Sequence, residues 1–111
     1  MNNLHLSVEA QNDLAEIKAY ITEELENPDA ALATISRITK KIRILKNQAY
    51  VGTSLSSVAD TESDYRFLVS GNYLVFYRAY GKDVYIDRVL YGRRDYMRIL
   101  FGDAQTDETD K

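Results

Sequence analysis

Residues 65–102 contain seven basic side chains and only three acidic ones, so this segment has a net charge of +4 in a chain whose overall charge is −3. The seven are Arg66, Arg78, Lys82, Arg88, Arg93, Arg94 and Arg98. An arginine stays charged at any working pH and offers a planar fork of donors that matches a phosphate. The C-terminal part of the fold is therefore a candidate phosphate-binding surface. A mixed, solvated surface explains the same charges equally well.

Other kinds of chemistry find little support in the composition. Cysteine is absent, which excludes disulfides, thiolate metal sites and a cysteine nucleophile. The single histidine, His5, argues against a histidine metal cluster or a Ser-His-Asp triad, and we expect it to be an ordinary strand residue. We expect no metal and no cofactor. No apolar run approaches membrane-spanning length, so the predicted location is the cytoplasm, without a membrane partner.

Two amphipathic helices are predicted in the N-terminal half, over residues 8–26 and 28–46. Ser7 is a suitable N-cap for the first helix, and Pro28 suits the first position of the second. The first apolar stripe consists of Ala10, Leu14, Ile17, Ile21 and Leu25, with Asp13, Glu16, Glu23 and Glu24 expected on the opposite face. The second stripe consists of Ala31, Ile35, Ile38, Ile42 and Leu45. A hairpin of two such helices needs a sheet to cover its stripes.

The sequence predicts strands that can form this sheet. Residues 4–6 alternate as in a short strand, and three longer runs follow a polar connection at 47–64: Tyr65–Val69, Tyr73–Tyr80 and Val84–Tyr91. Turn residues at 70–72 and 81–83 favour an antiparallel meander, and residues 93–101 read as a short helix. The predicted fold is α+β, a helical hairpin on a twisted, mainly antiparallel sheet in the order β-α-α-β-β-β-α. It forms one domain over residues 1–102, before an acidic tail at 103–111 that we expect to be disordered.

One continuous block carries a family resemblance. Residues 65–96 read YRFLVSGNYLVFYRAYGKDVYIDRVLYGRRDY. This resembles the C-terminal half of toxins of the RelE/ParE superfamily, with a Tyr-Arg strand, a Gly-x-Tyr strand ending in an aromatic-Tyr-Arg run, an Arg-Val strand and then Gly-Arg-Arg-Asp-Tyr. The N-terminal half is similar through the helix pattern SxxAxxDLxxIxxYI, which starts here at Ser7. The resemblance spans residues 4–98, nearly the whole domain.

The resemblance implies the toxin half of a bacterial type II toxin–antitoxin pair, neutralised by a cognate antitoxin encoded next to it. Toxins of the RelE branch are metal-independent endonucleases that cut messenger RNA in the ribosomal A site. Those of the ParE branch keep the fold but poison DNA gyrase. The predicted target is therefore ribosome-bound mRNA, slightly preferred, or DNA gyrase. A degenerate, non-catalytic antitoxin-binding module is the third alternative.

The resemblance also points to site residues. RNA cleavage without a metal needs a base for the 2′-hydroxyl, cations for the pentavalent phosphate and an acid for the leaving oxygen. Arg66 falls where the RelE branch has a catalytic lysine, and Arg94 matches its C-terminal arginine. Tyr96 is the candidate acid, although it lies on a different helical turn from the tyrosine of that branch. Tyr73 replaces a central-strand arginine, which leaves the set incomplete. We expect Arg66 and Arg94 to converge on one basic concave site.

Three further arginines are candidates for RNA or phosphate contacts: Arg93, Arg78 and Arg88. Arg78 and Arg88 lie on adjacent predicted strands, where pairing with Asp87 or another carboxylate is the structural interpretation. Arg93 opens the last helix, where the helix dipole disfavours a cation, so its position favours a functional reason. Sheet packing is favoured over base stacking for the tyrosines of the strands, Tyr73, Tyr77, Tyr85 and Tyr91.

Overall fold

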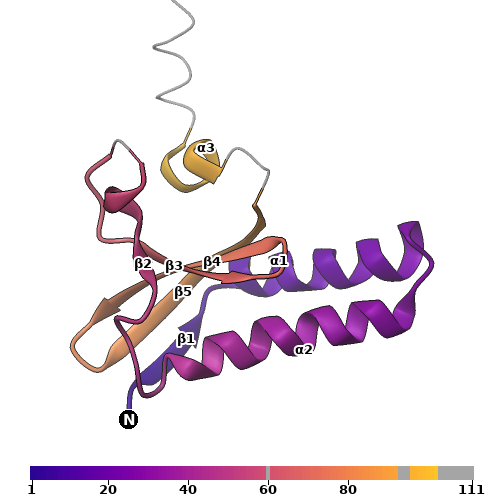
Figure 1. Cartoon of the computed structure of the whole chain (residues 1–111), viewed down its shortest axis with the longest axis horizontal. Coiled ribbons are helices and arrows are strands. Elements are labelled where there is room, and N and C mark those ends of the chain that lie inside the picture. The colour runs from indigo at the N-terminus through magenta and orange to yellow at the C-terminus, as the bar shows by residue number, and fades with distance from the viewer. Residues whose placement is uncertain (60, 93–95, 103–111) are drawn as a thin grey trace, which may run out of the picture.

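The computed structural model describes residues 1–59, 61–92 and 96–102 and shows an α+β fold over this part of the chain (Figure 1). In chain order the elements are β1 (Asn3–Leu6), α1 (Val8–Ala19), a π-helical turn η1 (Tyr20–Glu24), α2 (Pro28–Ile44), β2 (Thr53–Ser54), a 3-10 turn η2 (Leu55–Ser57), β3 (Arg66–Ser70), β4 (Tyr73–Tyr80), β5 (Asp83–Tyr91) and α3 (Tyr96–Phe101).

A five-stranded sheet in the order β1-β5-β4-β3-β2 forms the centre of the fold. The predicted meander is confirmed, because β3, β4 and β5 pair antiparallel through short turns. β1 pairs parallel to β5, with Asn3 opposite Asp83 and Leu6 opposite Ile86. β2 lies inside the stretch for which the sequence indicated no strand, and its two residues pair with Arg66 and Phe67. Two residues are too few to show an alternating pattern.

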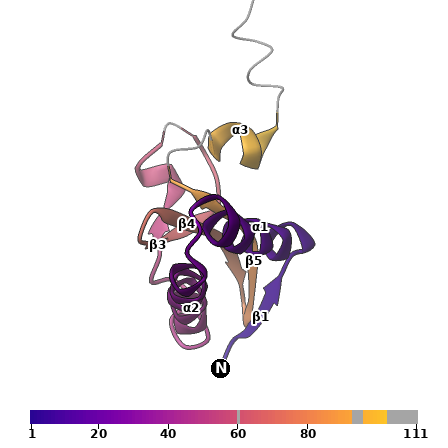
Figure 2. The ribbon, with the colours of Figure 1, turned by 90° about the vertical axis from the view of Figure 1, so that its right-hand side faces the viewer.

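The two helices lie side by side on one face of the sheet, which confirms the predicted hairpin (Figures 1 and 2). Their starts are as expected. Ser7 accepts a hydrogen bond from the backbone N–H of Ala10, and Asn27 accepts one from Ala30 with Pro28 at the first helical position. The hairpin face holds the main core, in which Ile38, Val75 and Ile86 are fully buried.

The opposite face, called the open face below, carries a smaller core at one end. Leu55, Phe76 and Leu90 are buried there, under η2 and α3. Figure 1 shows α3 across the sheet from the helical hairpin. The predicted last helix is present from Tyr96 onward, whereas its first residues, 93–95, lie outside the described residues, as does the tail at 103–111.

Two expectations for the first helix are wrong. Leu25 was expected on the buried stripe but is 57% exposed. The π-helical turn, with its bond from Leu25 N–H to the Tyr20 carbonyl, rotates the residues that follow off the stripe. Asp13 was expected on the solvent face but is 8% exposed, because it pairs with Arg88 of β5.

Candidate functional site

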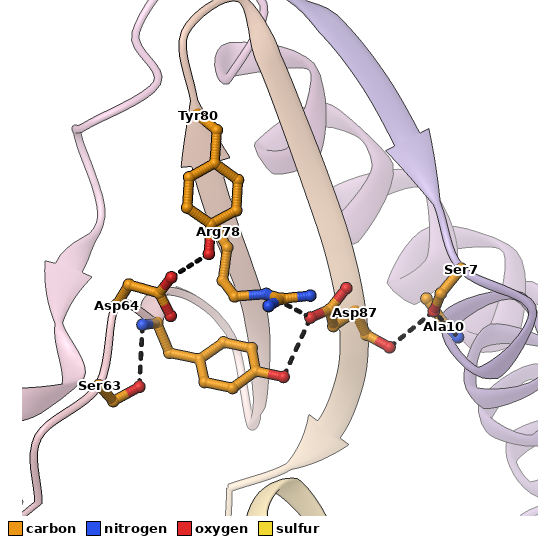
Figure 3. Close-up of polar contacts among 8 residues, drawn as sticks. Ser7, Ala10, Ser63, Asp64, Arg78, Tyr80 and Asp87 are labelled. Atoms are coloured by element: carbon orange, nitrogen blue, oxygen red, sulfur yellow. Dashed lines mark hydrogen bonds and ion pairs between the residues drawn. The ribbon is translucent and has the colours of Figure 1, made fainter.

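A bulge in β5 creates the polar centre of the open face. In the pairing of β4 with β5, Tyr77 lies opposite Ile86 but Phe76 lies opposite Arg88, so Asp87 is an extra residue in β5. A bulge of this kind bends the strand and re-aims a side chain. Here it brings the Asp87 carboxylate beside side chains from two other segments (Figure 3).

Asp87 joins three segments of the chain. Its Oδ2 accepts a hydrogen bond from the Tyr65 hydroxyl at 3.0 Å and one from Arg78 Nε at 2.9 Å. The Arg78 guanidinium also lies over the Tyr65 ring, 5.4 Å from its centroid. At the backbone, the Asp87 carbonyl accepts a hydrogen bond from the Ser7 hydroxyl at 2.7 Å, as Figure 3 shows. The cluster borders an open pocket of about 350 Å³, walled on one side by Ile99 and Leu100 of α3.

The electrostatics of this cluster keep Tyr65 neutral. Burial, followed by the negative charge and the hydrogen bond of Asp87, raises the pKa of Tyr65 to about 12. Burial alone would lower the pKa of Arg78, but the charge and hydrogen bond of Asp87 together with the neighbouring Tyr65 and Tyr80 outweigh it, so that pKa lies above its ordinary value. Tyr65 is thus a hydrogen-bond donor at neutral pH and a poor general base. Arg78 keeps its charge, compensated by Asp87.

Arg88 lines the same pocket, but its guanidinium already forms hydrogen bonds with Asp13. Its Nε and Nη2 donate to the two Asp13 oxygens, each at 2.8 Å, and Asp13 also accepts the backbone N–H of Val89 at 2.9 Å. This bidentate pair fastens α1 to β5. Two candidate phosphate contacts, Arg78 and Arg88, therefore meet at one pocket, each compensated by an aspartate.

Arg66 lies on the hairpin face, away from this pocket. It is opposite Tyr77 in the β3–β4 pairing, and Tyr77 belongs to the hairpin-face core. Its Nη1 donates to the Gly52 carbonyl at 2.8 Å, and its guanidinium covers the Tyr50 ring at 5.1 Å. These contacts hold the loop before β2. The structure therefore separates Arg66 from Arg78 and Arg88 by the thickness of the sheet.

The remaining candidates lie at the start of the last helix. Tyr96 packs its ring against Phe76 at a centroid distance of 5.3 Å, within the small core of the open face. Arg93 and Arg94 fall outside the described residues, so the predicted convergence of Arg66 with Arg94 stays a prediction.

Sequence reasoning raised the Arg78–Asp87 pair, and it is present. It missed Tyr65 as a partner of Asp87 and Asp13 as the partner of Arg88. A local signal for the bulge was present but not used: Val84 and Ile86 are two residues apart, whereas the next buried residue of that face, Val89, follows three residues later, after Asp87 and Arg88. Over the described part of the chain, no three carboxylate or histidine side chains gather as a metal site would require, and no helix has the length and apolarity to cross a membrane.

Comparison with known proteins gives a consistent set of matches. A family model described as the ParE toxin of the type II toxin–antitoxin system parDE matches residues 4–96. The fold is similar to a solved chromosomal ParDE system from P. aeruginosa, with a TM-score of 0.68, 24% identity, and coverage of 82% of this chain and 96% of the other. It is also similar to YafQ from E. coli, with a TM-score of 0.52, 16% identity, and coverage of 92% and 100%. No curated protein sequence matches significantly.

Proposed function

The chain belongs to the family of ParE toxins of type II toxin–antitoxin systems, and from this premise we propose that it arrests growth by poisoning DNA gyrase and is silenced by a cognate antitoxin. We infer the target from the family, because toxins of the ParE branch poison DNA gyrase. The antitoxin follows from the same membership. Neither role requires the chain to catalyse a reaction of its own.

The observation that carries the choice of target is the compensation of the arginines in the open-face pocket. Cleavage of RNA without a metal needs cations free to stabilise the phosphate and a base close to them. Here Asp13 and Asp87 already neutralise Arg88 and Arg78, and the raised pKa of Tyr65 makes it a poor base. Arg66 lies on the other face of the sheet. Among the described candidates, the arrangement favours a binding surface over a nuclease site.

Ribosome-dependent mRNA cleavage is the competing hypothesis, and one experiment separates the two. The chain is induced alone, and the cells are examined for double-strand breaks trapped on gyrase and for mRNA cut at A-site codons. We expect growth arrest with trapped gyrase and intact mRNA. Cut mRNA with intact DNA would replace the proposed target with the ribosome. Undisturbed growth at confirmed expression of folded protein would identify the non-catalytic antitoxin-binding module.

Variants at the predicted catalytic positions sharpen this test. Arg66→Ala and Arg94→Ala are induced in the same way, each after its folding has been checked. If toxicity depends on cleavage by these two residues, both variants lose toxicity together with mRNA cleavage. Under the gyrase proposal, any loss of toxicity is instead accompanied by a loss of trapped gyrase.

For the antitoxin we propose a segment that lies across the hairpin and the sheet, in the groove between η1 and the ends of β4 and β5. This groove has a volume of about 530 Å³ and a mainly apolar lining that includes Ile17, Tyr73 and Tyr91. At its rim Tyr20 and Leu25 are 55% and 57% exposed. An apolar helix or strand of the antitoxin would cover these side chains.

The groove is tested with a charge placed at its rim. Leu25→Asp should weaken binding of the purified cognate antitoxin by at least tenfold, because it places a negative charge in a mainly apolar groove whose lining already includes Glu16. Leu32→Asp is the matched control, since Leu32 is 59% exposed on α2 and does not line the groove. Equal affinities for the two variants would place the antitoxin elsewhere.

A further inference from the structure

A row of aromatic side chains crosses the open face from the end that α3 covers, where Tyr65 contacts Phe101, to β1. We call it the aromatic ladder, and it consists of His5, Tyr85, Tyr80 and Tyr65 with the Arg78 guanidinium among them. The rings of His5 and Tyr85 stack at 4.9 Å, and those of Tyr85 and Tyr80 lie 6.2 Å apart. Arg78 lies 5.9 Å from the Tyr80 centroid and 5.4 Å from that of Tyr65. The row therefore extends across β1, β5 and β4 to the residue before β3.

Strand register places these side chains together. His5 is directly opposite Tyr85 in the β1–β5 pairing, and Tyr85 is directly opposite Arg78 in the β4–β5 pairing. Residues opposite one another point to the same face of a sheet. Tyr80 and Tyr85 remain 47% and 37% exposed, and the His5 side chain 47% exposed. A stacked aromatic surface of this extent is available to a partner.

Carboxylates hold the polar ends of the ladder. The Tyr80 hydroxyl donates to Asp64, as Figure 3 shows, and the Tyr65 hydroxyl donates to Asp87. At the other end, His5 Nε2 lies 3.0 Å from Asp83. Three negative charges thus contact the ladder, and Arg78 supplies one positive charge within it. This balance opposes the phosphates of a nucleic acid and favours a cation.

Arg78 shows how a guanidinium can bind to the rings of this ladder. Arg78 lies between two of the rings while its Nε donates to a carboxylate at 2.9 Å. A guanidinium over an aromatic ring gains from the negative face of the ring and, through its remaining donors, from nearby acids. On the same face, Tyr85 and the 42% exposed side chain of Asp83 offer a further ring and a further carboxylate, next to the Tyr80 ring that Arg78 already contacts.

We propose that the aromatic ladder binds an arginine-containing segment of a partner protein, with an incoming guanidinium at the exposed Tyr85 ring, next to the Tyr80 ring that Arg78 contacts. This surface lies on the sheet face opposite the helical hairpin. The inference therefore stands apart from the target and from the antitoxin groove proposed above.

The probe is an acetylated hexa-arginine peptide, titrated into the whole chain at 150 mM salt while the tyrosine ring signals are followed by NMR. We expect saturable shifts at Tyr80 and Tyr85. The double variant Tyr80→Leu/Tyr85→Leu keeps the net charge but removes two rings, so its affinity should fall about tenfold. Tyr20→Leu/Tyr91→Leu is the matched control, with two exposed rings removed elsewhere and the affinity unchanged.

Three outcomes would overturn the proposal. The first is an equal loss of affinity in the two double variants, which would show that the rings of the ladder have no special role. The second is equal affinity for a hexa-lysine peptide, because general attraction to an acidic protein does not distinguish ammonium from guanidinium. The third is tighter binding of a thymidine oligonucleotide with shifts at the same rings, which would make the ladder a base-stacking platform.

Discussion

The two faces of the sheet are built in different ways. Under the helical hairpin, the side chains are mostly aliphatic and fully buried, and the Tyr77 hydroxyl is satisfied by the backbone N–H of Gly52 at 2.9 Å. On the open face, the apolar core is limited to Leu55, Phe76 and Leu90 and the side chains around them, and the rest is a network of tyrosines, arginines and aspartates. Stability is thus concentrated on one face, which leaves the other to present polar groups at a fixed geometry.

The largest effect is expected from a cavity on the hairpin face. Ile38→Ala should lower the free energy of unfolding by about 2–5 kcal/mol, because Ile38 is fully buried between α2 and the sheet. Urea denaturation measures the change. Leu32→Ala on the same helix is the control and should cost less than about 0.5 kcal/mol, since Leu32 is 59% exposed. Similar losses in the two variants would contradict the assignment of the main core.

A somewhat smaller effect is expected where α1 is fastened to β5. Asp13→Asn should cost about 1–3 kcal/mol in urea denaturation, because it weakens the bidentate pair with Arg88 and the bond from Val89 N–H. Glu16→Gln removes the same charge from an exposed position on the same helix and should be nearly neutral. If Asp13→Asn and Glu16→Gln lower the free energy of unfolding equally, the loss reflects net charge and not the pair with Arg88.

On the open face, we expect Tyr65 to titrate above the ordinary pKa of a tyrosine. Its pKa of about 12 in the folded chain lies above the ordinary value of 10.0. The stabilisation linked to this shift is therefore fully present below pH 10.0 and is lost as the pH rises toward 12. Asp87→Asn should lower the pKa of Tyr65, measured from the pH dependence of its ring carbon shifts, whereas Asp83→Asn should leave it unchanged. A Tyr65 that titrates at its ordinary value would disprove the contact with Asp87.

The smallest effect on stability is expected from the aromatic ladder. Tyr80→Leu/Tyr85→Leu should change the free energy of unfolding by less than about 1 kcal/mol, since both side chains are partly exposed and leucine keeps some of the apolar contact. The same urea experiment measures it. A loss above about 2 kcal/mol would mean that the ladder supports the fold, and the contrast between the two faces would disappear.

The sequence predicted the elements whose signals are local. The helix starts at Ser7 and Pro28 and the turn residues between the runs of β3, β4 and β5 are such signals. The sequence patterns did not predict contacts between residues that lie far apart in the chain. Asp13 is buried because Arg88, 75 residues later, reaches it, and no helical pattern contains that information.

The candidate site was less predictable than the fold for the same reason. The bulge at Asp87 brings Tyr65 and Arg78 together. The change of spacing from Ile86 to Val89 marks the bulge in the sequence, but it does not name the partners that Asp87 meets. The strand register places Arg66 on the opposite face from Arg78. The roles predicted for Arg93 and Arg94 lie in residues that the structure does not describe.

The parallel pairing of β1 with β5 has a consequence for how the chain folds during its synthesis. Asn3 and Asp83 are partners, although 80 residues separate them. Contacts of such separation form late, because a long loop must close before they are gained. The N-terminal strand and the helical hairpin are synthesised first, and their apolar stripes stay uncovered until β4 and β5 have left the ribosome. A chain that stops before Asp83 therefore keeps exposed apolar surface, which makes it prone to aggregation and degradation.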